Sequence, residues 1–313
     1  MSNKTVVILD HNGGRLGNQL WNFAHIYAYC LERGYACRNM CFYGYERFFS
    51  TTSIHPAIDP IWKLLPGRAK RKIHALITKK ITSNKNNYIL HADKMDGDQA
   101  VRCYLPPSPN PNNGQKSILN SFEESSAKHL YCVGWAFRNP VGISKYHSQI
   151  TSYLRPAERI TKPAIEEITK LRLRYHSIIG VHIRQGDYQT YAGGKFFFSQ
   201  SEIRAHLDVY LRANKKDPLT TLFYICSDGP IDQNIFEGLQ YIIGSHGAVG
   251  DMHALSLTDR IIASDSTLSG YAAWYGNIPI TLFTRPMKTD IDWQTFEVSK
   301  VFDYNYGSYN LQP

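Results

Sequence analysis

Residues 178–188 read Ile178-Ile179-Gly180-Val181-His182-Ile183-Arg184-Gln185-Gly186-Asp187-Tyr188, and the fold expected for the chain is built outward from them. Their apolar first half predicts a buried strand of a parallel sheet, ending at a polar turn. Side chains alternate along a strand, so His182 and Arg184 share one face. Open α/β sheets bind ligands at the carboxyl ends of their strands, where Arg184 and Asp187 are expected. Arg184 therefore either binds an anion or forms an ion pair with Asp187 that closes the turn.

The segments after this run alternate between strand and helix patterns. Strands are expected at 220–226, 260–263 and 278–283, and helices over 251–257 and 268–275. Another helix begins at the capping box Ser199-Gln200-Ser201-Glu202 and carries an apolar stripe of Ile203, Leu207, Tyr210 and Leu211. This alternation predicts a doubly wound parallel sheet of the α/β class. Ser266 and Thr267 precede one of the helices, where they either hold a phosphate or only cap the helix.

The first half of the chain opens in a Rossmann-like way. A strand at 5–9 is followed by a glycine-containing turn and by apolar residues at helical spacing, until Gly34 ends the helix. Gly14 and Gly17 either let the backbone approach an anion at the helix N-terminus or only shape a tight turn. The turn does not read G-x-G-x-x-G and lacks the acidic residue that contacts a ribose, so NAD binding is disfavoured. Two more strands are expected at 36–43 and 130–135.

A domain boundary is expected near 151–163, because Pro156 and Pro163 break the chain there. It separates domain 1–155 from domain 156–313.

The 313 residues carry a formal net charge of +9, which favours anionic partners such as nucleotide phosphates, nucleic acid or a membrane surface. Many cations fall in 61–81, an amphipathic helical pattern whose basic face is expected to be solvated. The alternative is contact with an anionic membrane or a lipid-linked substrate. The 6 cysteines lack zinc-site or disulfide-scaffold spacing and indicate reduced thiols. Neither a signal peptide nor an apolar run of about 20 residues is found, so a soluble cytoplasmic protein is expected.

Three separated stretches carry motifs of one family. Residues 14–24, GRLGNQLWNFA, resemble the opening GGLGNQMFQYA, and residues 182–188, HIRQGDY, resemble HxRRGDY. Residues 251–274 resemble the block DLxLMS…IIANSTFSWWGAW, and 223–228 match a strand that ends in FSDD more weakly. In this order and spacing, over most of its length, the chain resembles glycosyltransferase family eleven, the alpha-1,2-fucosyltransferases.

The resemblance implies a GT-B architecture, in which two Rossmann-like domains face each other across a cleft. Domain 1–155 would be the acceptor side and domain 156–313 would bind GDP-fucose, with the last helix expected to pack back on the N-terminal domain. The implied reaction is inverting, metal-independent transfer of L-fucose from GDP-beta-L-fucose to a glycan or lipid-linked saccharide, at O2 of a terminal galactose. The protein would act in carbohydrate biosynthesis. It would not bind nucleic acid and would make at most peripheral contact with a membrane.

Other functions stay open beside this one. They are alpha-1,6 or alpha-1,3 fucosyl transfer, a non-catalytic basic protein that binds nucleic acid or membrane, and a nicotinamide-dependent oxidoreductase.

The resemblance also assigns site residues by matching positions. The catalytic residues would be Arg184, which would hold the donor pyrophosphate and stabilise the leaving GDP, together with Asp187 and His182. The residues expected to bind the donor are Arg184, Asp228, Ser266, Thr267, Asp265, Gly14, Gly17 and Asn18. The general base is open among Asp187, His182, Asp10, His11 and a phosphate oxygen of the donor. No metal ligand is expected.

The chain departs from the family pattern at four places. Gln185 stands where HxRRGDY has its second arginine, and Asp265 stands where the third motif has asparagine. Gly270-Tyr271 replace two tryptophans, and Arg15 is an additional residue of the N-terminal loop. These differences bear on the acceptor and the linkage more than on the donor.

Overall fold

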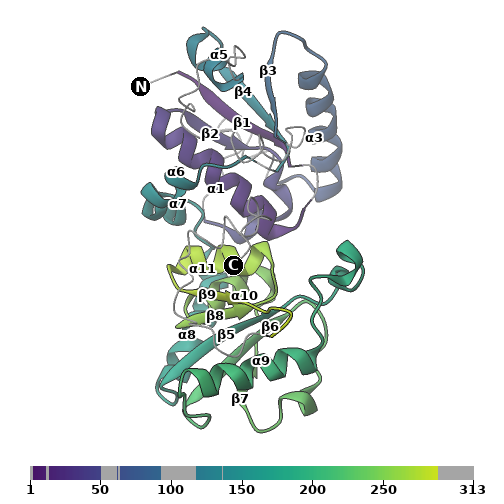
Figure 1. Cartoon of the computed structure of the whole chain (residues 1–313). Helices are drawn as coiled ribbons and strands as arrows, with labels where there is room; N and C mark the ends of the chain where they lie inside the picture. Colours follow the sequence, from purple (N-terminus) through teal and green to yellow (C-terminus); the bar gives the residue numbers. More distant parts are fainter. Residues whose placement is uncertain are drawn as a thin grey trace, which may run out of the picture. The chain divides into compact units, whose positions relative to one another are not determined.

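The protein is described by a computed structural model that covers residues 3–11, 14–50, 62, 64–92, 118–135 and 137–287. The chain divides into two compact units, Met1–Arg155 and Pro156–Pro313 (Figure 1). Among the described helices, none is both long and apolar enough to cross a membrane.

The N-terminal unit holds a four-stranded parallel sheet in the order β2-β1-β4-β3. Its strands are β1 (Thr5–Asp10), β2 (Ala36–Asn39), β3 (Tyr88–His91) and β4 (His129–Val133). Its helices are α1 (Leu16–Arg33), α3 (Gly67–Thr82), α5 (Ile118–Glu124), α6 (Pro140–Lys145) and α7 (His147–Tyr153), with short 3-10 turns η1 (Phe42–Gly44) and η2 (Glu46–Phe48).

The predicted strand-turn-helix opening of this unit is confirmed. Gly34 ends α1 in the left-handed conformation, with φ of 65°, and its neighbour Tyr35 donates its backbone N–H to the Cys30 carbonyl. The strand expected over 36–43 is shorter than predicted. It ends at Asn39, whose side-chain oxygen accepts the backbone N–H of Cys41 and turns the chain into η1.

The C-terminal unit holds a five-stranded parallel sheet in the order β7-β6-β5-β8-β9. Its strands are β5 (Ser177–Ile183), β6 (Thr221–Ser227), β7 (Gln240–Ile243), β8 (Arg260–Ala263) and β9 (Ile280–Leu282). Its helices are α8 (Glu158–Arg172), α9 (Gln200–Ala213), α10 (Gly247–Ser256) and α11 (Thr267–Gly276), with 3-10 turns η3 (Asp187–Gln189), η4 (Tyr191–Gly194) and η5 (Gln233–Phe236). The α/β class with two Rossmann-like parallel sheets is thus confirmed.

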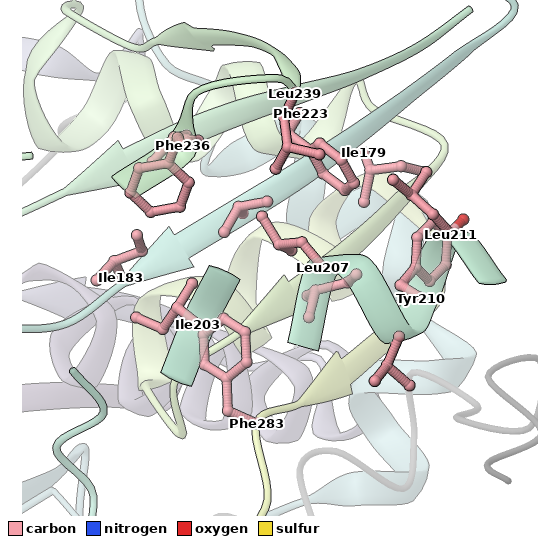
Figure 2. Close-up of a cluster of buried hydrophobic side chains, with 14 of the residues drawn as sticks. Ile179, Ile183, Ile203, Leu207, Tyr210, Leu211, Phe223, Phe236, Leu239 and Phe283 are labelled. Carbon is pink, nitrogen blue, oxygen red and sulfur yellow. The ribbon is translucent and has the colours of Figure 1, made fainter. Parts of the chain in front are cut away.

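The core of this unit explains which way the central strand points its side chains. Ile179, Val181 and Ile183 pack with the apolar stripe of α9, as Figure 2 shows for Ile203 and Leu207. The residues between them must therefore face the other side of the sheet. A side chain at Gly180 would lie 2.8 Å from a methyl carbon of Leu255 on α10, so α10 packs closely on that face. The predicted capping box of α9 is present, with Ser199 accepting the Glu202 N–H.

Pro163 does not break the chain as predicted, because it lies inside α8. Pro163 is exposed. Because proline has no backbone N–H, one helical carbonyl is left without a donor, and water can hydrogen-bond to it instead. Buried Thr161, Ala164 and Ile168 hold the opposite face of the helix against the unit. The expected last helix falls in 288–313, outside the described residues.

Candidate active site

Three segments of the C-terminal unit end side by side at one edge of its sheet. Strand β5 lies between β6 and β8, and His182 is in register with Cys226 and with Ala263. Arg184 follows β5, Asp228 follows β6, and Ser264 follows β8. Because all strands are parallel, this edge carries their carboxyl ends, where α/β folds bind ligands.

Arg184 is held between two carboxylates. Its Nη1 donates to Oδ2 of Asp228 at 2.5 Å, and its Nη2 donates to Oδ1 of Asp187 at 2.7 Å. The ion pair with Asp187 that closes the turn is therefore present, and Asp228 adds a second one. A guanidinium has five N–H donors, of which these two bonds use one each. The side chain is 13% exposed, so its orientation is fixed while part of it can still reach a ligand.

The Asp228 carboxylate also holds the backbone that follows β5. Oδ1 of Asp228 accepts the backbone N–H of Gln185 at 2.7 Å, and the Ser264 hydroxyl accepts the backbone N–H of Arg184 at 3.1 Å. A side chain at Gly186 would lie 2.8 Å from Oδ2 of Asp228. Any side chain at this position would therefore force the Asp228 carboxylate to move away from the turn.

Gln185 has a structural role that its sequence position did not reveal. Its Nε2 donates to the Ser227 hydroxyl at 3.2 Å and to the Pro230 carbonyl at 3.1 Å. Gln200 of α9 donates to the same Pro230 carbonyl at 2.8 Å. Where the family motif has a second arginine, this chain therefore has a neutral side chain that fixes the loop after β6.

His182 is buried on the α10 side of the sheet and is 4% exposed. Burial, with a smaller contribution from the positive charge of Arg184, lowers the pKa of His182 to about 4, while the negative charge of Asp228 opposes the shift. Its Nδ1 is buried and has no hydrogen-bond partner among the described residues. The imidazole is thus neutral at physiological pH and can make a hydrogen bond, but it is a weak proton acceptor there.

Tyr188 connects the turn after β5 to the turn after β8, which the sequence did not predict. Its hydroxyl donates to the backbone carbonyl of Asp265 at 2.5 Å, and its ring centroid lies 5.4 Å from Cζ of Arg184. Burial raises the pKa of Tyr188. The ring therefore supports one side of the guanidinium. An aromatic residue that directly follows a charged strand end is the signal that could have indicated this contact.

The turn after β8 begins α11 and holds three predicted donor-binding residues. The Ser266 hydroxyl accepts the Leu268 N–H at 3.4 Å, so the capping role expected as an alternative is present. Thr267 is the first residue of the helix and is partly exposed. Burial raises the pKa of Asp265 to about 6, and nearby Lys195 opposes the shift. A helix N-terminus favours a negative charge, so this turn can hold either that carboxylate or a ligand anion.

The remaining predicted residues belong to the N-terminal unit. Gly14 has φ of 82°, and its carbonyl accepts Nε2 of Gln19 at 3.1 Å. Gly17 lies in the first turn of α1, directly before Asn18, and Asp10 ends β1. The C-terminal unit alone thus brings together Arg184, Asp187, His182, Asp228, Asp265, Ser266 and Thr267. Among the described residues, no group of three or more His, Cys, Asp or Glu side chains could hold a metal ion.

Solved structures with a similar fold include fucosyltransferases of GT-B architecture. A mutant of Arabidopsis thaliana FUT1 in complex with GDP has a TM-score of 0.56 at 13% identity, over 91% of this chain and 72% of that one. POFUT1 in complex with GDP has a TM-score of 0.54 at 12% identity, over 90% and 99%. NodZ alpha-1,6-fucosyltransferase co-crystallized with GDP has a TM-score of 0.51 at 13% identity, over 91% and 96%.

At identities this low, the structural similarity shows a shared fold alone. No protein-family model matches the sequence, and no curated protein matches it.

Proposed function

We propose that this protein is an inverting, metal-independent fucosyltransferase that uses GDP-beta-L-fucose and transfers L-fucose to O2 of a terminal galactose. The observation that carries the proposal is the position of Arg184. It stands at the carboxyl end of the central strand, within a motif that resembles the family motif, and two carboxylates fix its orientation. A fixed guanidinium recognises phosphate through paired, charge-assisted hydrogen bonds.

In the proposed reaction an acceptor hydroxyl oxygen attacks C1 of fucose from the face opposite the diphosphate. The bond between C1 and the phosphate oxygen breaks, and GDP leaves with the bonding electron pair. The acceptor proton passes to a base, and the configuration at C1 inverts. Negative charge grows on the leaving diphosphate, and Arg184 would stabilise it there.

Arg184 alone does not make the site attractive to a diphosphate, because Asp187 and Asp228 together outweigh its single positive charge. We assign the missing attraction to the N-terminus of α11, next to Ser266 and Thr267, where backbone N–H groups favour anions. The two carboxylates would act by holding the guanidinium in one orientation before the donor binds. Such preorganisation avoids reorganisation during the reaction.

Two of the candidate general bases, His182 and Asp187, are less suited to this role than the others. His182 has a pKa of about 4, which is poorly matched to proton abstraction at neutral pH. The Asp187 carboxylate already accepts a hydrogen bond from Arg184. We therefore favour Asp10 or His11 of the N-terminal unit, or a phosphate oxygen of the donor. Alpha-1,6 and alpha-1,3 linkages are the alternatives to alpha-1,2, since Asp265 and Gly270-Tyr271 depart from the family motif.

The test is calorimetric titration of GDP and GDP-fucose, with a chelator present, into the wild type and Arg184→Ala. Arg172→Ala is the matched control, because Arg172 also donates to a carboxylate, Asp259, which caps the amino end of β5. Charge-assisted hydrogen bonds contribute about 1.5–3 kcal/mol each, so Arg184→Ala should weaken GDP binding by about tenfold or more. Arg172→Ala should leave it unchanged.

Absence of GDP binding to the wild type under these conditions would overturn the donor assignment. If GDP binds, the linkage follows from NMR of the product formed with galactose-terminated glycans.

A further inference from the structure

Helix α3 is attached to the N-terminal unit by polar residues. Lys70 donates to Oε1 of Glu46, and both side chains of this ion pair are 9% exposed. One turn later, Nε2 of His74 donates to the carbonyl of Leu9 at 2.6 Å. The inner face of α3 therefore relies on a buried lysine and a buried histidine.

The opposite face of α3 carries cations and apolar side chains together. Five exposed cations follow each other at spacings that place them on one stripe of the helix, namely Arg68, Arg71, Lys72, Lys79 and Lys80. Leu76 completes the stripe and is 69% exposed, Ile73 beside it is 36% exposed, and Leu64 just before the helix is 86% exposed. We call these eight residues the α3 surface.

The charge of the α3 surface has no internal balance. No acidic residue occurs in the sequence 64–82. None of the five cations forms an ion pair with a residue that the structure describes. With a rise of 1.5 Å per residue, the stripe from Arg68 to Lys80 is about 18 Å long. Figure 1 draws α3 at the right-hand side of the N-terminal unit.

We propose that the α3 surface docks on an anionic lipid bilayer. A helix that lies in a membrane interface presents cations to lipid phosphates and inserts apolar side chains between the headgroups. Leu76, set among the cations, matches that environment. A nucleic-acid backbone would use the cations but offers no apolar partner for Leu76 and Leu64. This proposal is independent of the proposed transferase activity.

Helix α8 provides an internal comparison. It also exposes an apolar side chain, Ile165, which is 44% exposed, and Leu173 directly after the helix is 85% exposed. Its cations alternate with acidic residues, including Glu158, Glu166 and Glu167. Exposed apolar residues alone are common on protein surfaces. The unbalanced positive charge around them distinguishes α3.

The experiment is co-sedimentation of the full chain with vesicles of phosphatidylcholine alone, or of phosphatidylcholine and phosphatidylglycerol in equal parts. The variant Lys79→Gln/Lys80→Gln removes two cations from the α3 surface, and the control Lys162→Gln/Lys170→Gln removes two exposed cations from α8. Each cation near an anionic membrane strengthens binding about fivefold, so the α3 variant should bind the anionic vesicles at least tenfold more weakly. The control should bind like the wild type.

A third variant, Leu76→Gln, tests insertion and should also weaken binding at equal charge. Circular dichroism must show that each variant keeps the wild-type helix content. The proposal is overturned if the wild type does not co-sediment with anionic vesicles, or if the α3 and α8 variants lose binding equally. It is also overturned if duplex DNA competes and Leu76→Gln has no effect, because the surface would then serve nucleic acid.

Discussion

Asp228 acts on its neighbours through both of its oxygens. One oxygen accepts the Arg184 guanidinium and the other accepts the backbone N–H of the next residue, Gln185. The carboxylate therefore fixes the side chain and the turn at once. The contacts within the protein thus give Asp228 a positioning role at the proposed donor site, and its predicted contact with the donor stays a prediction.

Asp265 provides a pH-dependent test of the proposed site. Burial raises the pKa of Asp265 to about 6, so its charged form costs folding free energy. Below pH ~4, the pKa of the unfolded state, the carboxyl is neutral and its full contribution to the free energy of unfolding is present. That contribution is lost as the pH rises through ~6, the pKa in the folded state. A neutral Asp265 would also repel a diphosphate less, so GDP should bind more tightly when this carboxyl is protonated.

We therefore expect Asp265→Asn to bind GDP more tightly than the wild type at pH ~7.5 and nearly equally well below pH ~5. The ratio of the two dissociation constants, measured by calorimetry at each pH, cancels the titration of GDP itself. Asp208→Asn, which removes a surface carboxylate paired with Arg204 on α9, is the control. A ratio independent of pH would place Asp265 outside the donor site.

At the scale of elements, helices α9 and α3 are attached to their units in different ways. Helix α9 packs through a continuous apolar stripe of Ile203, Leu207 and Tyr210. Helix α3 depends on the buried ion pair between Lys70 and Glu46. Apolar packing tolerates small changes, whereas a buried charge without its partner is strongly destabilising.

Glu46→Gln should therefore destabilise the protein by about 3–5 kcal/mol, because the Lys70 ammonium would stay buried without a countercharge. Urea unfolding measures the change. Adding Lys70→Met to the same chain should restore much of the loss. Asp208→Asn removes a partly exposed ion pair and should cost only about 0.5 kcal/mol. A similar small effect for Glu46→Gln would mean that the ion pair does not anchor α3.

At the scale of the whole molecule, the residues predicted to bind the donor are divided between two compact units. The cluster around Arg184 belongs to Pro156–Pro313, and Gly14, Gly17 and Asn18 belong to Met1–Arg155. The facing of the two domains across a cleft stays a prediction of the family resemblance. Ligand linkage can test which unit holds the nucleotide, since a ligand stabilises the unit that binds it.

Scanning calorimetry should show a transition that GDP raises and a second one that GDP leaves in place. At one hundred times its dissociation constant a ligand adds about 2.7 kcal/mol, or about 5–10 °C for a unit of this size. Arg184→Ala should reduce the shift. Equal shifts of both transitions would show that GDP stabilises both units, against the assignment to the C-terminal one.

The sequence by itself determined the elements whose signals are local. The buried strand before Arg184, the capping box of α9 and the strand-turn-helix opening each depend on residues within a few positions of one another. Strands β3 and β7 escaped prediction because each is a short, largely half-buried edge strand of 4 residues, whose apolar run is too brief to be told from a loop. Pro163 was misjudged because a proline on a solvated helix face need not end the helix.

Only the tertiary structure decided how the site residues meet. Arg184 reaches Asp228 across 44 positions of sequence, and Tyr188 reaches the Asp265 carbonyl across 77. A local sequence pattern cannot reveal these pairs, because they depend on the strand order β7-β6-β5-β8-β9. This order places the ends of β6 and β8 on either side of β5. Local patterns report whether a residue is buried and in which element. The hydrogen-bonded pairing of strands then determines which of those residues become neighbours.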